Sequence, residues 1–153
     1  RGNRMNKIVK ATENEVSELA PLFDAYRQFY GFAADLTLAE QFLTDRLRHE
    51  DSVVWLAYDR TGTPIGFTQM YPSFSSTLAG KVWILYDLFV SEAGRQQGIG
   101  RQLMETAIFW ARSTDAVEVS LAAATDNFAA QRLYVALGFQ KDTDFWVYSL
   151  DPR

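Results

Sequence analysis

The stretch that decides the fold is Tyr86-Asp87-Leu88-Phe89-Val90-Ser91-Glu92-Ala93-Gly94-Arg95-Gln96-Gln97-Gly98-Ile99-Gly100-Arg101. An apolar strand ends at Val90, and a short loop then opens into a helix at Gly98 and Gly100. The glycines allow a sharp turn and leave backbone N–H groups uncovered at the helix N-terminus. Those groups and the helix dipole favour an anion, and Arg95 and Arg101 would add charge-assisted hydrogen bonds. The stretch therefore predicts a site for a ligand that carries a pyrophosphate.

Length and composition narrow the class of protein. The chain has 153 residues, enough for one domain with its own core, and its net charge of −4 argues against a broad nucleic-acid footprint. It has no cysteine, which excludes disulfides, thiolate metal sites and a cysteine nucleophile. A single histidine excludes His-rich zinc sites, and we expect no metal. No apolar run approaches the roughly 20 residues of a membrane helix. We therefore expect a cytoplasmic protein without a membrane or nucleic-acid partner.

The first residues are set apart from the rest of the chain. Residues 1–4 lack the apolar core of a signal peptide, and we expect them to be an expression remnant ahead of Met5. No linker, repeat or low-complexity tract follows. Residues 5–153 are accordingly predicted to form a single domain.

Two amphipathic helices are predicted near the start of the chain. Each opens with a capping box, and the pairs are Thr12 with Glu15 and Thr37 with Glu40. Apolar residues then recur at helical spacing to about Tyr30 in the first helix and to Leu47 in the second. His49 follows the second helix, and we expect it to be a solvated surface residue rather than a ligand.

The remaining chain alternates strands and helices. Strands are predicted at residues 7–11, 52–58, 64–71, 83–90, 116–121 and 145–150, a Ser/Thr-rich loop at 72–80, and helices at 98–112 and from Asn127 to Gly138. Hairpins and strand–helix–strand crossovers both occur in this order. The sheet should therefore be mixed and the class α+β.

The glycine loop has competing interpretations when it is considered alone. It lacks the Gly-Lys-Ser/Thr ending of a Walker loop, and a dinucleotide fingerprint usually lies in the first strand–turn–helix of a parallel sheet. It could also be a plain strand-to-helix turn. Further along, Asn127, Ala130 and Tyr134 share one helix face. Asn127 could equally be an N-cap, and Tyr134 half-buried core.

Three motifs together resemble the GNAT superfamily of N-acetyltransferases. They are Asp87-Leu88-Phe89-Val90, Arg95-Gln96-Gln97-Gly98-Ile99-Gly100, and Asn127-Phe128-Ala129-Ala130-Gln131-Arg132-Leu133-Tyr134 followed by Gly138-Phe139. The motifs cover roughly residues 80–140, and the predicted element order matches the fold over almost the whole chain. The resemblance implies a single-domain fold whose mostly antiparallel mixed sheet is splayed between its fourth and fifth strands and flanked by four helices. Within the superfamily, the chain is most similar to the branch that acetylates small amines and polyamines.

The resemblance also implies where acetyl-CoA binds. The backbone of Leu88, Phe89 and Val90 would pair with the pantetheine arm. The pyrophosphate would lie on the loop formed by Arg95, Gln96, Gln97, Gly98, Ile99, Gly100 and Arg101. Asn127 would bond to the cofactor arm beside Ala130, and Tyr134 would protonate the departing thiolate. A phenol with a pKa near 10 keeps its proton at neutral pH and can serve as that acid.

The general base is less well defined. An alkyl ammonium must lose a proton before it attacks, at a cost of about 4–5 kcal/mol at pH 7. Some relatives carry a glutamate earlier on the fourth strand, where this chain has Ile84 or Tyr86. Asp87 is the nearest carboxylate and our candidate, acting directly or through water. A structural role for Asp87 is an equal alternative, and Glu118 could serve if it faces the cleft.

The acceptor pocket of the family is built from the first two helices and nearby loops. The candidates by position are Tyr26, Tyr30, Asp35, Tyr71, Phe74 and Ser75, although core packing would explain most of them. Aromatic rings with one acid would suit a small cationic amine. Amino acids and aminoglycosides are also open as acceptors. The alternatives are a protein lysine or N-terminal acetyltransferase, an acyl-CoA sensor or scaffold without turnover, and a nucleotide-binding regulatory domain. A homodimer is common in the family and would fit Trp146 and Tyr148 on the last strand.

Overall fold

The computed structural model describes residues 6–153. The expectation about residues 1–4 and a start at Met5 lies outside the described residues. The chain divides into two compact units, one reaching Ala122 and the other formed by Ala123–Arg153. The single domain over residues 5–153 therefore stays a prediction.

The first unit contains a five-stranded mixed sheet. Its strands are β1 (Lys7–Lys10), β2 (Val53–Tyr58), β3 (Pro64–Ser75), β4 (Gly80–Val90) and β5 (Glu118–Ser120), and they lie side by side in chain order. Neighbouring strands from β1 to β4 run antiparallel, and β5 runs parallel to β4. The predicted α+β class with a mostly antiparallel mixed sheet is confirmed.

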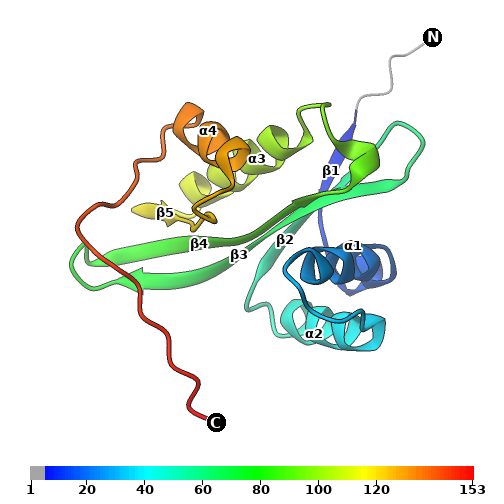
Figure 1. Cartoon of the computed structure of the whole chain (residues 1–153), viewed down its shortest axis with the longest axis horizontal. Coiled ribbons are helices and arrows are strands. Elements are labelled where there is room, and N and C mark those ends of the chain that lie inside the picture. The colour runs from blue at the N-terminus through cyan, green and yellow to red at the C-terminus, as the bar shows by residue number, and fades with distance from the viewer. Residues whose placement is uncertain (1–5) are drawn as a thin grey trace. The chain divides into compact units, whose positions relative to one another are not determined.

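Helices cover both faces of this sheet. Helices α1 (Val16–Phe29) and α2 (Leu36–Arg48) lie on one face, and α3 (Ile99–Ser113) lies on the other (Figure 1). On the α1 face, Leu19, Phe23 and Leu43 pack against Leu56 and Phe67 of the sheet. On the α3 face, the cluster is formed by Ala57, Ile65, Ile99 and Leu103. The sheet is therefore the shared wall of two apolar cores.

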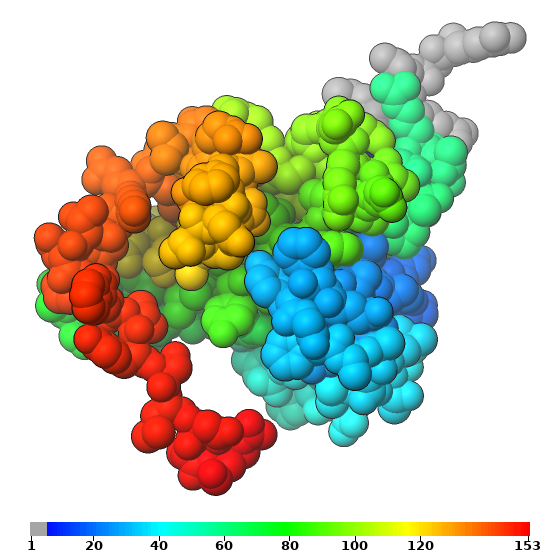
Figure 2. Space-filling view, in the orientation of Figure 1, coloured from blue at the N-terminus to red at the C-terminus, as the bar shows by residue number. Residues whose placement is uncertain are grey.

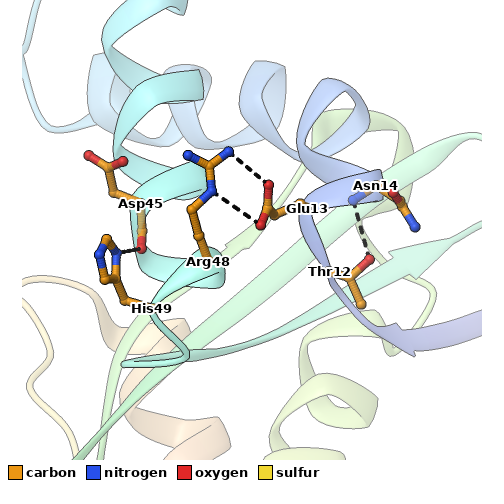
Figure 3. Close-up of polar contacts among 6 residues, drawn as sticks. All are labelled: Thr12, Glu13, Asn14, Asp45, Arg48 and His49. Atoms are coloured by element: carbon orange, nitrogen blue, oxygen red, sulfur yellow. Dashed lines mark hydrogen bonds and ion pairs between the residues drawn. The ribbon is translucent and has the colours of Figure 1, made fainter.

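The first predicted capping box is present. Thr12 Oγ1 accepts the N–H of Asn14 (Figure 3). The Glu15 carboxylate accepts the backbone N–H of Thr12 at 3.0 Å. It opens a 3₁₀ turn, η1 (Glu13–Glu15), that leads into α1. Glu13 of this turn pairs with Arg48 at 3.1 Å, so the chain before α1 is joined to the end of α2 (Figure 3).

The end of α2 also shows where the single histidine lies. His49 is exposed, as predicted, and its Nδ1 lies 2.7 Å from the carbonyl oxygen of Asp45 (Figure 3). Its place is the C-cap of α2.

The start of α2 differs from the prediction. Asp35, not Thr37, is the N-cap, and its carboxylate accepts the N–H of Leu38 at 3.0 Å. The backbone N–H of Asp35 in turn donates to the buried carboxylate of Asp24 at 2.9 Å. A capping pattern in the sequence does not specify which of two nearby polar residues takes the cap, and here the contact with Asp24 holds Asp35 in that position.

The loop predicted at residues 72–80 is also wrong. Strand β3 continues to Ser75 and β4 begins at Gly80, so the two strands form one long hairpin. Pairing between β2 and β3 stops at Val53 and Met70, which leaves the outer part of β3 with a neighbour on one side only. A strand edge of this kind tolerates Pro72, because a missing N–H costs nothing there.

A β-bulge interrupts the pairing of β3 and β4. Gln69 pairs with Asp87 and Met70 pairs with Leu85, so Tyr86 is an extra residue without a partner in β3. Before the bulge, Trp83 points to the α3 face, where its Nε1 donates to Thr114 at 2.8 Å. In a regular strand Asp87, four residues later, would point the same way. The extra residue reverses the alternation and turns Asp87 to the α1 face.

Strands β4 and β5 are paired over only part of their length. The pairs run from Val82 with Glu118 to Ile84 with Ser120. Strand β4 continues to Val90 without β5 beside it, which is the splayed arrangement expected of the sheet. Within residues 6–122, the backbone edge of β4 beyond Ile84 that faces away from β3 is not covered by another strand.

The second unit contains one helix, α4 (Phe128–Ala136). Asn127 is its N-cap, and Gly138, with φ of 99°, is the left-handed residue that the sequence predicted after the helix end. The strand predicted at residues 145–150 is wrong, because this segment is exposed and pairs with no strand. Its alternation reflects β propensity, which forms no strand without a partner edge.

None of the helices in residues 6–153 has both the length and the apolar character needed to cross a membrane.

Candidate active site

A cavity of about 320 Å³ opens between α1, α2, the connection between these helices and the strands β3 and β4. It is lined by Phe23, Tyr26, Arg27, Tyr30, Phe32, Phe42, Tyr71, Tyr86 and Asp87, and is called the aromatic cavity below. Figure 2 shows the light-blue surface of the α1–α2 connection beside the green surface of β3 and β4. All of these residues belong to the first unit. Seven of the nine are aromatic, and two are charged.

The carboxylate of the cavity belongs to Asp87, which is only 5% exposed. Its Oδ2 accepts a hydrogen bond from Gln69 Nε2 at 2.9 Å, and Gln69 Oε1 accepts one from Ser52 Oγ at 2.9 Å. The hydroxyl of Tyr26 is also hydrogen-bonded to Asp87. The carboxylate is therefore held from the sheet and from α1 while it lines the cavity.

Burial controls the protonation of this group. It raises the pKa of the Asp87 carboxyl above its usual range, and the hydrogen bonds from Gln69 and Tyr26 offset part of the rise. The pKa values of Tyr26 and Tyr71 are also raised, first by burial and then by the nearby charge of Asp87. Both phenols are therefore neutral donors at physiological pH. Asp87 is a better proton acceptor than an exposed aspartate because its conjugate acid is weaker.

Aromatic rings form the cavity walls. Tyr26 and Tyr30 meet edge to face with centroids 5.1 Å apart, and Tyr71 and Tyr86 do so at 5.6 Å. Around the opening, Tyr30, Phe32 and Phe42 are partly exposed. A ring face presents negative potential to a cation, so these walls and Asp87 favour the same kind of ligand.

The structure brings together some of the predicted acceptor residues and separates the others. Tyr26, Tyr30 and Tyr71 line the aromatic cavity with Asp87. Asp35 caps α2 instead. Phe74, which is 81% exposed, and Ser75 lie at the outer end of β3, and Glu118 lies exposed on β5, so none of the three lines the cavity.

Sequence reasoning missed several residues of the cavity. Phe23, Arg27, Phe42 and Tyr86 line it without having been predicted to do so. Gln69 was also missed, although an amide within the apolar run of β3 is a signal, because a buried polar side chain needs a partner.

The glycine loop, residues 95–101, precedes α3. The first hydrogen bond of the helix runs from the N–H of Gln102 to the carbonyl of Gly98 at 3.0 Å. The N–H groups of Ile99, Gly100 and Arg101 come before it and belong to the donors that a first helical turn leaves unpaired. The loop therefore presents backbone donors, as predicted from the sequence.

Two residues of the loop have left-handed backbone conformations. Gly98 has φ of 73°, and Gln96 has φ of 62°, which the sequence did not indicate. Gly100 lies within the first turn of α3 and does not form the bend. A Cβ added to Gly98 would meet no atom within 4 Å, so the space above this residue is open. Gly98 thus provides both the turn and an uncovered surface.

The flanking arginines already have partners in the protein. Arg95 Nε donates to the carbonyl of Val90 at 3.4 Å, and Arg101 pairs with Glu105 at 2.7 Å. The loop can hold an anion with its backbone groups without these side chains, and each of the two contacts uses only the Nε–H of its guanidinium.

Strand β4 leads into the glycine loop. The side chains of Leu88 and Val90 pack in the α3 cluster, and Phe89 packs in the α1 cluster. Both faces of the strand are therefore anchored. The polar groups that remain available along this stretch are those of its backbone edge.

In the second unit, Asn127, Ala130 and Tyr134 share one face of α4, as predicted. The Asn127 side chain accepts the N–H of Ala130 at 3.2 Å, so the N-cap interpretation is correct. The ring of Tyr134 meets that of Phe139 edge to face, with centroids 6.1 Å apart. This contact follows the turn at Gly138 and fixes one side of the Tyr134 ring.

Comparisons with known proteins agree on one family. A family model described as "Acetyltransferase (GNAT) family" matches residues 19–139. The uncharacterized N-acetyltransferase YhfO of Bacillus subtilis (strain 168) is 40% identical over 144 residues, which cover 94% of this chain and 96% of that protein. A crystal structure of a probable acetyltransferase is also 40% identical, with a TM-score of 0.89 over 96% of this chain and 98% of that one. The fold alone is shared with an aminoglycoside N-acetyltransferase in complex with CoA, at 19% identity and a TM-score of 0.80 over 98% of this chain and 97% of that one.

Proposed function

The chain belongs to the GNAT family of acetyltransferases, and we propose that it transfers the acetyl group of acetyl-CoA to a primary amine bound beside Asp87. The observation that carries the acceptor half of this proposal is a buried carboxylate in an aromatic cavity. Burial deprives this carboxylate of hydrogen bonds to water, and a protonated amine would supply a charge-assisted hydrogen bond instead. The same amine would lie against the faces of the aromatic rings.

The glycine loop fits the cofactor half of the proposal. Its N–H groups precede the first bond of α3, and the space above Gly98 is one that a side chain would fill. These are the properties of a phosphate cradle at a helix N-terminus. We assign the pyrophosphate of CoA to residues 95–101, and the pantetheine arm to the backbone edge of Leu88, Phe89 and Val90. Asn127 and Ala130 are further candidate contacts for this arm.

Two proton transfers accompany the reaction. Acetyl-CoA supplies a thioester, whose carbonyl carbon forms a bond to the amine nitrogen while its bond to sulfur breaks. Asp87, alone or through a water molecule, accepts the proton that the ammonium must lose before attack, and the second amine proton leaves after the C–N bond has formed. Tyr134 donates a proton to the departing sulfur and recovers one from solvent. The products are an amide, CoA with a free thiol, and one proton released to solvent.

The assignment of Asp87 as the base rests on its environment. Burial raises its pKa, which narrows the gap to the ammonium that it must deprotonate. Gln69 holds it in position from the sheet. A purely structural role for Asp87 would explain why its carboxylate is hydrogen-bonded. It would not explain why that carboxylate lines a cavity.

Release of the CoA thiol from acetyl-CoA, measured across a panel of primary amines, tests the proposed function. We expect turnover with at least one amine, and a loss of about 10²–10⁴-fold in kcat for Tyr134→Phe, the range for removing a general acid. Tyr58→Phe is the matched control, because Tyr58 lies on β2 outside the aromatic cavity and should leave kcat unchanged. Tight CoA binding without turnover of any amine would refute the enzyme and favour a sensor or scaffold.

A further inference from the structure

The aromatic cavity contains two opposite charges. Asp87 is buried on β4, and Arg27 lies on α1 among the residues that line the same cavity. A simple amine would neutralise Asp87 and leave the guanidinium of Arg27 in the same cavity without a counter-ion. The presence of Arg27 is therefore not explained by binding a cation alone.

Arg27 has no carboxylate partner among residues 6–153. No ion pair joins it to an aspartate or glutamate of this part of the chain, and the nearby Asp24 already accepts from Gln28 Nε2 at 3.1 Å and from the N–H of Asp35. The guanidinium carbon lies 5.0 Å from the centroid of the Phe32 ring. This contact positions the charge by a cation–π interaction and requires none of its five N–H donors.

The charge pattern and the cavity volume disfavour large polycations as acceptors. A polyamine or an aminoglycoside that placed one ammonium beside Asp87 would bring further positive charges toward Arg27, where like charges repel. The volume of 320 Å³ is also at the lower end of the roughly 300–1,000 Å³ range of ligand sites. The polyamine-like acceptor expected from the sequence is therefore disfavoured.

We propose that the acceptor is a small amino acid-like zwitterion, with its amine beside Asp87, its carboxylate on Arg27 and an apolar or aromatic frame against the cavity rings. This inference rests on the proposed function for the position of the amine. A guanidinium suits the carboxylate because its planar N–H groups can form two parallel hydrogen bonds with it. The aromatic walls then select the frame that joins the two charges.

Pairs of acceptors that differ only by a carboxylate test the inference. Phenylalanine is compared with phenethylamine, leucine with isoamylamine, and spermidine is added as a polyamine. We expect kcat/KM to be at least about tenfold higher for each amino acid than for its decarboxylated partner, which corresponds to roughly 1.4 kcal/mol of discrimination. Spermidine should be the poorest acceptor in the panel.

Variants of Arg27 assign that preference to one side chain. Arg27→Gln should lower kcat/KM for the amino acids by at least about tenfold and change it little for the decarboxylated amines. Arg27→Lys should restore part of the loss, because it keeps the charge and loses the paired geometry. Equal acetylation of both members of each pair, or equal losses in Arg27→Gln, would overturn the inference and leave the proposed function standing.

A binding measurement separates the two possible failures. Calorimetric titration of phenylalanine and phenethylamine into the wild-type protein with CoA present requires no turnover. Tighter binding of phenylalanine, lost in Arg27→Gln, would support the zwitterion site even if no amine were acetylated. Equal affinity for the two ligands would count against it whatever the activity.

Discussion

The glycine loop and the aromatic cavity are two candidate binding surfaces of the same unit, and one is formed by backbone groups whereas the other is formed by side chains. The loop is seven consecutive residues that present backbone N–H groups. The cavity is assembled from side chains of two helices, their connection and two strands, and its chemistry depends on one buried carboxylate and one arginine. Changes to side chains should therefore act strongly on the cavity, whereas the loop should respond to changes in backbone conformation.

The largest effect is expected at Asp87. Asp87→Asn keeps the size of the side chain and removes the base, so kcat/KM should fall by about 10²–10⁴-fold. The affinity for CoA should not change, because Asp87 does not belong to the glycine loop. Thiol release and CoA titration measure the two quantities. A parallel loss of CoA affinity would break the comparison by showing that the two surfaces are coupled.

The same variant should be more stable than the wild type at neutral pH. Burial raises the pKa of Asp87, so the folded protein holds this proton more tightly than the unfolded chain does, and the ionised group opposes folding. The favourable contribution is complete below the unfolded pKa of about 3.9 and is lost as pH rises through the folded value. Asparagine does not ionise, so the variant keeps the free energy of unfolding that the wild type loses when Asp87 ionises. Each kcal/mol kept should raise Tm by about 2–4 °C. A gain in Tm that persists undiminished toward pH 4 would contradict this cause.

An intermediate effect is expected at Gly98. Gly98→Val should weaken CoA binding by at least about tenfold. The φ of 73° should also cost this variant roughly 1–3 kcal/mol of stability. Gly98→Asn separates the two causes, because asparagine tolerates the left-handed conformation while its side chain enters the open space. If Gly98→Asn bound CoA like the wild type, the open space would not be a phosphate cradle.

The smallest effect is expected at Gln69. Its hydrogen bond lowers the pKa of Asp87, so Gln69→Met should raise that pKa and move the acid limb of the kcat/KM profile to higher pH, with the plateau unchanged. Ser52→Ala is the control, because it removes the outer hydrogen bond of the chain and leaves the one between Gln69 and Asp87. An acid limb that stays in place in Gln69→Met, or moves equally in Ser52→Ala, would exclude Gln69 from tuning the base.

The two surfaces also differed in how well the sequence predicted them. The glycine loop and the face of α4 are local, and spacing alone placed the loop at a helix N-terminus and the α4 residues on one face, although it did not indicate the left-handed Gln96. The cavity depends on long-range pairing, so only part of its lining was anticipated, including Tyr26, Tyr30, Tyr71 and Asp87. Asp35 was assigned to the pocket by its position in the chain. Its role as an N-cap depends on a contact with Asp24, eleven residues away, which the sequence pattern does not show.

Strand prediction failed in two segments whose pairing, or lack of it, differs from what their composition indicates. The outer half of the β3–β4 hairpin is polar and contains Pro72, yet it pairs along its whole length. The segment at residues 145–150 has the alternation of a strand and pairs with none. The composition of a segment indicates whether it can form a strand, and the presence of a neighbouring strand to pair with determines whether it does.

The bulge at Tyr86 makes the length of β4 a genetic constraint. A deletion of one codon at this position would keep every neighbouring residue type, but would restore the regular alternation of the strand. Asp87 and Phe89 would then point to the α3 face, and Leu88 and Val90 to the face of α1. Mutational drift can therefore exchange side chains around the cavity one at a time, whereas a single in-frame deletion in β4 would remove the carboxylate from it in one step.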